Sequence, residues 1–360
     1  MQKFICKTEI YTGRGALSHL SQLVRGPLMI VADPYFMKNG TAARLAELSK
    51  AKQVAYFDQV TADPSVTLAA QGAQAVQSFA PQTVIALGGG SAMDCAKAMV
   101  YFSRCPVRFI AVPTTSGSGS EVTDFAILTH QGIKHPLVDD KLVPQVAILD
   151  ADLLDGLPKS LVADTGFDVL SHALEAYVAT GATAITDALA SQAFCLAMEH
   201  LELSYMGNTQ VRQKLLDASC MAGMAFSQAG LGLCHALSHG LGGLYHIPHG
   251  RLNAILLPAV VEFNASAAGK KYAALARAAF GSSAGDTMAL RSLKNNLVRL
   301  RKQLNLPAFL QDAGVDTGKL DADLPVICKA VLQDACIGTN PAIVTEKDIA
   351  DILQQVKSRG

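Results

Sequence analysis

Before Asp150, four β-branched apolar segments alternate with helical stretches, and this alternation constrains the fold more than any other feature. The segments cover residues 27–33, 53–60, 83–90 and 107–115. Turn-forming residues bound each run, and a stretch with helical spacing follows each of the first three. Parallel strands joined by crossover helices produce this order. The first part of the chain is therefore predicted to be an α/β domain with a parallel sheet.

The helix after the second segment is predicted to begin at Asp63 and Pro64. An aspartate before a helix can accept hydrogen bonds from its free N–H groups. Proline is tolerated at the first helical position because its missing N–H would have no partner there.

Strand signals fade after Asp150, and apolar residues then recur at spacings of three and four. Residues 160–180, 185–203 and 211–228 carry this pattern most clearly, which is typical of packed helices. We therefore predict an α/β domain over residues 1–155 and an all-α domain over residues 156–360. A cleft between the two domains is expected to hold the substrate.

Composition narrows the class of partner. The chain has 30 Lys and Arg residues and 30 Asp and Glu residues, so no basic excess indicates nucleic acid. No run reaches the roughly 18 apolar residues of a membrane span, and the N-terminus has no signal-peptide pattern. We expect a cytoplasmic protein that handles small molecules. Its high apolar fraction and exposed edge strands favour a homo-oligomer.

The eight cysteines are scattered without a C-x-x-C pair. This spacing argues against a disulfide framework and against a zinc site made of thiolates.

Gly88, Gly89, Gly90 and Ser91 stand where a buried strand ends and a helix begins. Bare backbone N–H groups at a helix start can hold a pyrophosphate. The GGGS turn matches neither G-x-G-x-x-G nor a Walker loop, so a tight strand-to-helix connection is an equal alternative when the turn is taken alone.

A second loop, residues 113–123, follows the next strand and offers the hydroxyls of Thr114, Thr115 and Ser118 among glycines. Two such loops on adjacent strands favour a dinucleotide. Asp33, at the end of the first strand, could bind an adenosine ribose and repel a 2′-phosphate, which would favour NAD over NADP. Its other interpretation is a helix cap before Pro34.

Asp168 and His172 are four residues apart in a helical pattern, so their side chains leave the same helix face. His235 and His239 have the same spacing. His249 follows Pro248 and can return toward them from a new helix start. A lone histidine on an apolar helix is more often a core residue, but the paired spacings favour a metal site.

Four of the nine histidines, including His246, lie within fifteen positions. Nitrogen and oxygen ligands without a thiolate suit Fe²⁺ or Zn²⁺, and ligand type alone does not choose between them. A divalent cation bound by such ligands would polarise an oxygen atom of the substrate. His239 is the predicted catalytic residue, as a proton relay; its alternative is structural support.

The sequence resembles the iron-containing alcohol dehydrogenase family over nearly its whole length. The likeness is carried by GGGSAMDCAKA, PTTSGSGSEVTDFA, GFDVLSHALEAYV and GLGLCHALSHGLGGLYHIPHGRLNAILLP. The resemblance implies that Asp168, His172, His235 and His249 bind the metal ion, and that His239 lies beside the substrate. It also implies that NAD contacts the glycine loop and its neighbours, namely Asp33, Asp94, Thr114, Thr115, Ser118 and Lys134.

Three further segments, AGMAFSQAGLGL, GIKHPLVDDKLVPQVAILD and TNP, resemble the branch of the family that converts propanal and 1-propanol in propanediol-utilising bacterial microcompartments. This closer resemblance implies a small alcohol or aldehyde as substrate. It also implies a microcompartment shell or neighbouring enzymes as partners.

Three alternatives remain at this point. A lyase similar to dehydroquinate synthase would share the architecture, NAD and a metal, but its acidic substrate needs basic groups, and Arg251 is the nearest one to the histidines. A polyol oxidase similar to glycerol dehydrogenase usually lacks the full histidine pattern. A scaffold protein would have broken ligands or a filled glycine loop.

Overall fold

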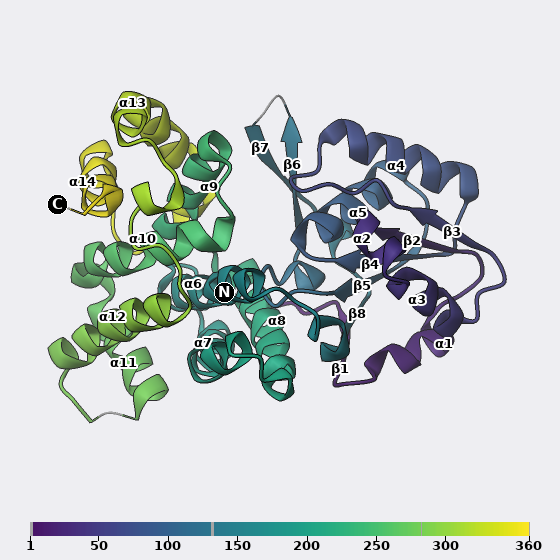
Figure 1. The fold of residues 1–360 in the computed structure, drawn as a ribbon, viewed down its shortest axis with the longest axis horizontal. Helices are drawn as coiled ribbons and strands as arrows, with labels where there is room; N and C mark the ends of the chain where they lie inside the picture. Colours follow the sequence, from purple (N-terminus) through teal and green to yellow (C-terminus); the bar gives the residue numbers. More distant parts are fainter. Residues whose placement is uncertain (1–2, 131–132, 282, 360) are drawn as a thin grey trace. The chain divides into compact units, whose positions relative to one another are not determined.

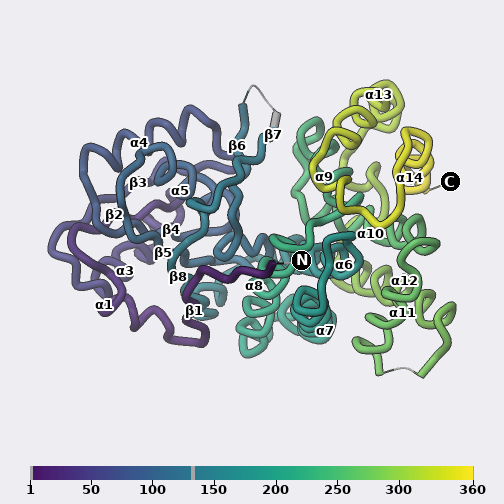
Figure 2. Tube along the Cα trace, turned by 180° about the vertical axis from the view of Figure 1, so that it is seen from behind, coloured from purple at the N-terminus to yellow at the C-terminus, as the bar shows by residue number. Residues whose placement is uncertain are grey.

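The computed structural model describes residues 3–130, 133–281 and 283–359. The chain divides into two compact units. Residues Ile5–Leu157 form the α/β unit, and residues Met1–Phe4 and Pro158–Gly360 form the helical unit. Figure 1 labels the elements of both units, and Figure 2 traces the same chain from behind.

The α/β unit is built on a six-stranded sheet in the order β1-β8-β5-β4-β2-β3. Every neighbouring pair in this sheet is parallel, as the strand–helix rhythm predicts. The strands are β1 (Glu9–Thr12), β2 (Leu28–Ala32), β3 (Val54–Phe57), β4 (Thr83–Gly88), β5 (Arg108–Pro113) and β8 (Val146–Leu149).

The strand order places a reversal between β2 and β4. From β2 the chain moves outward to β3, returns past β2 to β4, and then continues to β5 and β8. In open parallel sheets a ligand crevice forms beyond the carboxyl ends of the strands at such a reversal. Asp33 and Gly89, which follow β2 and β4, stand at this position.

Helices cover both faces of the sheet because the buried strands are apolar on both sides. Alternate residues of β2 separate cleanly, with Ile30 in the core cluster on one face and Val31 in the cluster on the other. The first cluster includes residues of α1 (Leu20–Leu23) and α3 (Thr41–Ser49), and the second includes residues of α4 (Val66–Phe79) and α5 (Gly90–Ser103).

The predicted start of α4 at Asp63 and Pro64 is wrong. The helix begins at Val66, and the side chain of Ser65 accepts a hydrogen bond from the N–H of Leu68. The Pro64 carbonyl instead accepts a hydrogen bond from Thr129. Asp63 has a positive φ of 50°, so it belongs to the preceding turn.

The helical unit contains no strand among its described residues. Helix α6 is buried along most of its length and packs against α7, α8 and α10. The helices are α6 (Lys159–Val178), α7 (Ala184–Tyr205), α8 (Arg212–Ala229), α9 (Leu233–Tyr245), α10 (His249–Phe263), α11 (Ala265–Phe280), α12 (Asp286–Gln303), α13 (Thr317–Gln333) and α14 (Glu346–Lys357).

Within the described ranges, no single helix is long and apolar enough to cross a membrane, although α10 and α11, bent by 112°, pass that test of length and composition as a pair.

Candidate active site

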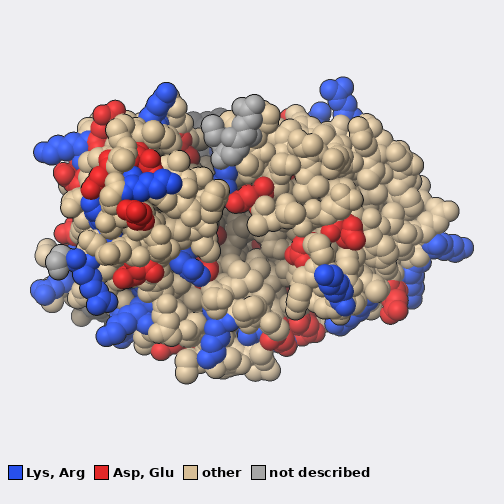
Figure 3. Space-filling model, turned by 45° about the horizontal axis from the view of Figure 1, so that its top comes forward, with Lys and Arg blue, Asp and Glu red and all other residues tan. Residues whose placement is uncertain are grey.

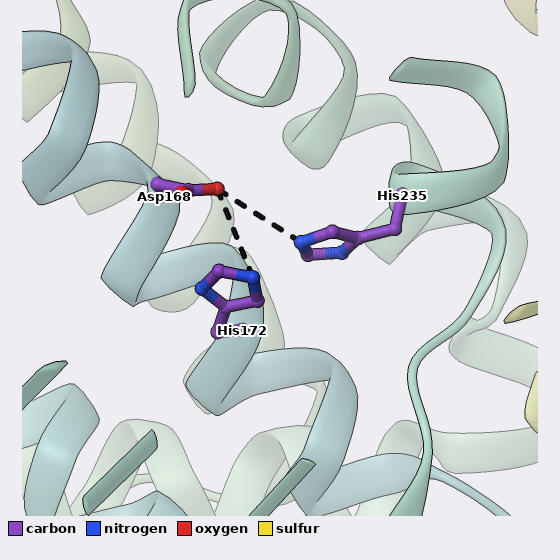
Figure 4. A group of neighbouring side chains, drawn as sticks. All are labelled: Asp168, His172 and His235. Carbon is purple, nitrogen blue, oxygen red and sulfur yellow. Dashed lines mark ion pairs between the residues drawn. The ribbon is translucent and has the colours of Figure 1, made fainter. Parts of the chain in front are cut away.

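Asp168 and His172 lie one turn apart on α6 and point in the same direction, as their spacing predicts (Figure 4). The Asp168 Oδ1 atom is 3.9 Å from His172 Nε2 and 3.9 Å from His235 Nε2. The His172 ring stacks on Phe226 with ring centroids 4.4 Å apart, and on His235 at 4.5 Å. These contacts restrict the direction of its Nε2 atom.

His235 lies in the first turn of α9 and is oriented by Glu175 of α6. The Nδ1 atom of His235 is 2.6 Å from Glu175 Oε2. The same carboxylate accepts hydrogen bonds from the N–H groups of Gly232 and Cys234 at 3.0 and 2.6 Å. Glu175 therefore caps the start of α9 and turns the Nε2 atom of His235 toward Asp168.

His249 is the first residue of α10, where Pro248 ends the preceding turn. Its Nε2 atom is 3.6 Å from Asp168 Oδ1. The His239 ring on α9 stacks on the His249 ring with centroids 5.2 Å apart. The four predicted ligands and His239 thus come together, whereas His246 is exposed at the end of α9.

Polar neighbours hold the side chains of Asp168 and His239 in place. Asn253 of α10 donates a hydrogen bond to Asp168 Oδ1 at 2.8 Å, and Ser238 donates one to Asn253 Oδ1 at 2.5 Å. His239 Nδ1 is 2.8 Å from Asp334 Oδ2. Glu175, Asn253 and Asp334 could not be predicted from the sequence, because no spacing rule links them to the distant histidines and carboxylate that they contact.

Burial shifts the pKa values of two groups in this site. It raises the pKa of Asp168, and the nearby His172 only partly offsets it. Burial, with the charges of His172 and His239, lowers the pKa of His235 well below its ordinary value. His235 is therefore neutral near pH 7, and its Nε2 lone pair is available to a ligand.

The residues present fit a divalent cation. His235 Nε2 is a buried polar atom without a hydrogen-bond partner in the described chain. The facing ligand atoms are 3.6–3.9 Å apart. A tetrahedral ion with nitrogen and oxygen ligands holds them about 3.4 Å apart. A metal-bound histidine usually donates its other ring N–H to a carboxylate or a carbonyl. Glu175 is in position to accept that hydrogen bond from Nδ1 of His235.

The two glycine-rich loops of the α/β unit touch each other. Helix α5 begins at Gly90 with Gly89 as its N-cap, so the N–H groups of its first turn open beyond the sheet. A Cβ atom at Gly89 would lie 3.1 Å from Thr115 Oγ1, and one at Gly90 would lie 3.3 Å from the Ser118 side chain. The missing side chains of these glycines therefore allow the two loops to approach each other closely.

Three other predicted cofactor residues form hydrogen bonds or ion pairs within the chain. Asp33 caps α2 (Pro34–Lys38) by accepting a hydrogen bond from Tyr35 N at 2.8 Å. Lys134 pairs with Asp63 at 2.7 Å. Asp94 accepts hydrogen bonds from Ser120 Oγ and Ile127 N, at 2.9 and 3.1 Å. Asp94 therefore holds the loop after β5 against α5.

Two buried ionisable side chains near the loop after β5, Glu121 and Lys97, were not predicted from the sequence. Glu121 is 1% exposed, and its Oε1 atom has no hydrogen-bond partner in the described chain. Lys97 is fully buried, and its Nζ atom donates to the carbonyls of Thr123 and Phe125 at 2.9 Å. Burial raises the pKa of Glu121 to about 7 and lowers that of Lys97 to about 8.

Glu121 predicts a pH-dependent stability. Its folded-state pKa of about 7 exceeds the ordinary 4.5, so the folded chain binds more protons than the unfolded chain between these values. Stability then falls as pH rises through this window, by about 2–3 kcal/mol for this group. We expect the wild-type free energy of unfolding, relative to Glu121→Gln, to fall by that amount between pH 4.5 and 7.5. Urea unfolding at both pH values measures it, and a constant difference would contradict this account of Glu121.

Comparison with known proteins identifies the family. The iron-containing alcohol dehydrogenase family model matches residues 7–151, and the C-terminal model of this family matches residues 162–357. The chain is 38% identical to the 1-propanol dehydrogenase PduQ of Citrobacter freundii, over 99% of this chain and 100% of the relative. It is 37% identical to the NADPH-dependent butanol dehydrogenase of Clostridium saccharobutylicum, over 99% and 98%.

A solved structure gives the same result for the fold. The iron-containing alcohol dehydrogenase of Thermococcus thioreducens superposes with a TM-score of 0.92 at 31% identity, covering 98% of this chain and 99% of that one. With two family models that together cover most of the sequence, the chain belongs to the iron-containing alcohol dehydrogenase family.

Proposed function

We propose that this chain interconverts a short primary alcohol and its aldehyde, 1-propanol and propanal, with NAD(H) as the hydride carrier. The main observation behind the proposal is that the Nε2 atoms of His172, His235 and His249 lie 3.6–3.9 Å from Asp168 Oδ1. Among the described residues, the buried Nε2 atom of His235 has no hydrogen-bond partner. The similarity to the propanol dehydrogenase supports the choice of substrate.

Asp168, His172, His235 and His249 are the proposed ligands of a divalent cation, Fe²⁺ or Zn²⁺. Bound there, such a cation supplies a positive charge that polarises a carbonyl or hydroxyl oxygen. Asn253 and Glu175 orient two of these ligands through hydrogen bonds of 2.8 and 2.6 Å. The remaining chemistry requires a hydride carrier and a path for one proton.

His239 is the proposed catalytic residue for that proton. Its ring stacks on His249, and Asp334 binds its Nδ1 atom at 2.8 Å. This contact leaves the Nε2 atom of His239 to exchange a proton with the substrate oxygen. The side chain is 30% exposed, so the imidazole can also exchange protons with water.

The cofactor is proposed to lie across the carboxyl edge of the sheet at the reversal between β2 and β4. The proposed pyrophosphate site is the helix start at Gly88, Gly89, Gly90 and Ser91, where N–H groups and the helix dipole favour an anion. Its other proposed contacts are Asp33, Asp94, Thr114, Thr115, Ser118 and Lys134.

Asp33 is expected to select NAD over NADP, although a relative is named as NADPH-dependent. Asp33→Ser keeps a capping oxygen for α2 and removes the charge that would repel a 2′-phosphate. We expect the ratio of kcat/KM for NADPH to that for NADH to rise about tenfold or more, roughly 1.4 kcal/mol.

The matched control for this prediction is Asp58→Asn, which removes an exposed carboxylate after the neighbouring strand β3. An unchanged ratio in Asp33→Ser would mean that Asp33 acts only as the cap of α2.

The proposed reaction is tested by loading the anaerobically purified protein with Fe²⁺ or Zn²⁺ and following NADH oxidation with propanal. We expect turnover in the loaded protein and almost none after chelation. Turnover of polyols but not of propanal would favour the glycerol dehydrogenase alternative. No turnover of any short aldehyde with either metal would overturn the proposal and favour the lyase alternative.

We propose that the chain forms a homo-oligomer in the bacterial cytoplasm, inside a microcompartment. Its proposed partners there are the microcompartment shell or neighbouring enzymes. It rests on the resemblance to the propanal-reducing branch of the family and on the edge strands β1 and β3. On the face drawn in Figure 3, basic and acidic side chains lie interspersed rather than in one basic patch. This distribution agrees with small-molecule partners rather than nucleic acid.

A further inference from the structure

A second group of potential ligands lies beside the proposed metal site and consists of His239, Asp334 and Cys336. One ligand atom of each residue lies within 4.8 Å of the other two. Asp334 joins the end of α13 to the 3-10 helix η7 (Ala335–Thr339), which contains Cys336. None of the four proposed ligands of the first site belongs to this group.

Hydrogen bonds already connect these three residues. His239 Nδ1 is 2.8 Å from Asp334 Oδ2, and Asp334 Oδ1 accepts a hydrogen bond from the backbone N–H of Cys336 at 2.8 Å. A cation bound here would replace the proton that His239 and Asp334 share.

We propose that His239, Asp334 and Cys336 form a second metal site, which takes Zn²⁺ and inhibits the enzyme. An imidazole nitrogen, a carboxylate oxygen and a thiolate sulfur make up a zinc-type ligand set. Zinc bonds of about 2.0–2.3 Å place such atoms about 3.2–3.8 Å apart. This spacing lies between the 2.8 Å of the His239–Asp334 contact and the 4.8 Å within which all three ligand atoms lie. Binding releases to water the thiol proton and the proton held between His239 and Asp334.

Charge and exposure favour entry of a cation here. Burial alone would raise the pKa of Asp334, but the hydrogen bond and charge of His239 hold it at about 2, so the carboxylate is anionic at neutral pH. The side chains of His239 and Asp334 are 30% and 18% exposed. Sulfur distinguishes this site from the first, which offers only nitrogen and oxygen, and it favours zinc over iron.

Inhibition would follow because the second ion occupies His239. Metal bound at Nδ1 replaces the Asp334 contact that orients the imidazole, and adds a positive charge beside the first site. This consequence rests on the proposed role of His239 in catalysis, whereas binding of the second ion does not.

Cobalt tests the binding without reference to activity. Co²⁺ bound to a thiolate gives a near-ultraviolet charge-transfer band, and ligands limited to nitrogen and oxygen give none. We expect the band to develop with the second equivalent of Co²⁺ in the wild type and in Cys6→Ser, which removes an exposed thiol. The band should be lost in Cys336→Ser. A band that persists in Cys336→Ser, or no band in the wild type, would overturn the second site.

Zinc then tests the inhibition. In protein that already holds one metal ion, we expect a further equivalent of Zn²⁺ to remove most propanal reduction in the wild type. Cys336→Ser should keep its basal activity and need at least tenfold more zinc for the same loss. A cobalt band without zinc inhibition would overturn the inhibitory role and, with it, the catalytic role of His239. Equal zinc sensitivity in both proteins would overturn inhibition through this site.

Discussion

His249→Ala is expected to lower kcat/KM for propanal reduction at least a hundredfold, about 3 kcal/mol, and to leave the purified protein with little bound metal. His249 begins α10, and its Nε2 atom faces Asp168 Oδ1 at 3.6 Å. Its side chain is 30% exposed, so its loss should leave the core packing intact. Metal content by elemental analysis, kcat/KM and circular dichroism are measured together.

The matched control is His246→Asn, which changes an exposed histidine three positions away. His246 adopts the left-handed conformation at φ 54°, and asparagine tolerates this conformation. We expect wild-type metal content and activity. If His249→Ala kept its metal and its activity, His249 would not be a ligand.

Gly250→Ala is expected to destabilise the helical unit by about 2–3 kcal/mol through overpacking and to weaken metal binding at least tenfold. A Cβ atom at Gly250 would lie only 2.6 Å from the carbonyl carbon of Asp164 and 3.3 Å from Asp168 Cβ. Because the first obstacle is backbone, α10 must move away from α6. That shift separates Asp168 and His172 from His249.

Gly269→Ala in α11 is the matched control, since a Cβ atom there meets nothing within 4 Å. It should be neutral or stabilise by up to about 1 kcal/mol, because alanine favours the helix. Urea unfolding followed by the helical signal, with a metal titration, compares the two variants. Equal stability of both would contradict the close packing of α6 on α10.

The fold was predictable where local pattern and burial agree. The four apolar segments correspond to β2, β3, β4 and β5, and the helical spacing after Asp150 corresponds to α6, α7 and α8. The strands β1 and β8 were not predicted, and their length alone does not explain this, because β3 also has only four residues. The hairpin of β6 (Phe125–His130) and β7 (Ile133–Val138) contains Pro136, which obscures a strand.

The site was predictable where its ligands share a helix. Asp168 with His172, and His235 with His239, are each one turn apart, so spacing alone indicated a common face. Glu175 and Asp334 act on histidines 60 and 95 residues away. Such contacts depend on how α6, α9 and α13 pack, which periodicity does not encode. The buried Glu121 Oε1 atom, which has no hydrogen-bond partner in the described chain, likewise becomes evident only from the structure.

The central claim is that one divalent cation lies among Asp168, His172, His235 and His249. Anomalous diffraction at the iron absorption edge, from crystals of protein loaded with one equivalent of Fe²⁺, tests it most directly. We expect one strong anomalous peak bonded to Asp168 and to the Nε2 atoms of the three histidines, at about 2.0–2.2 Å. A peak elsewhere, or none among these four side chains in fully loaded protein, would contradict it.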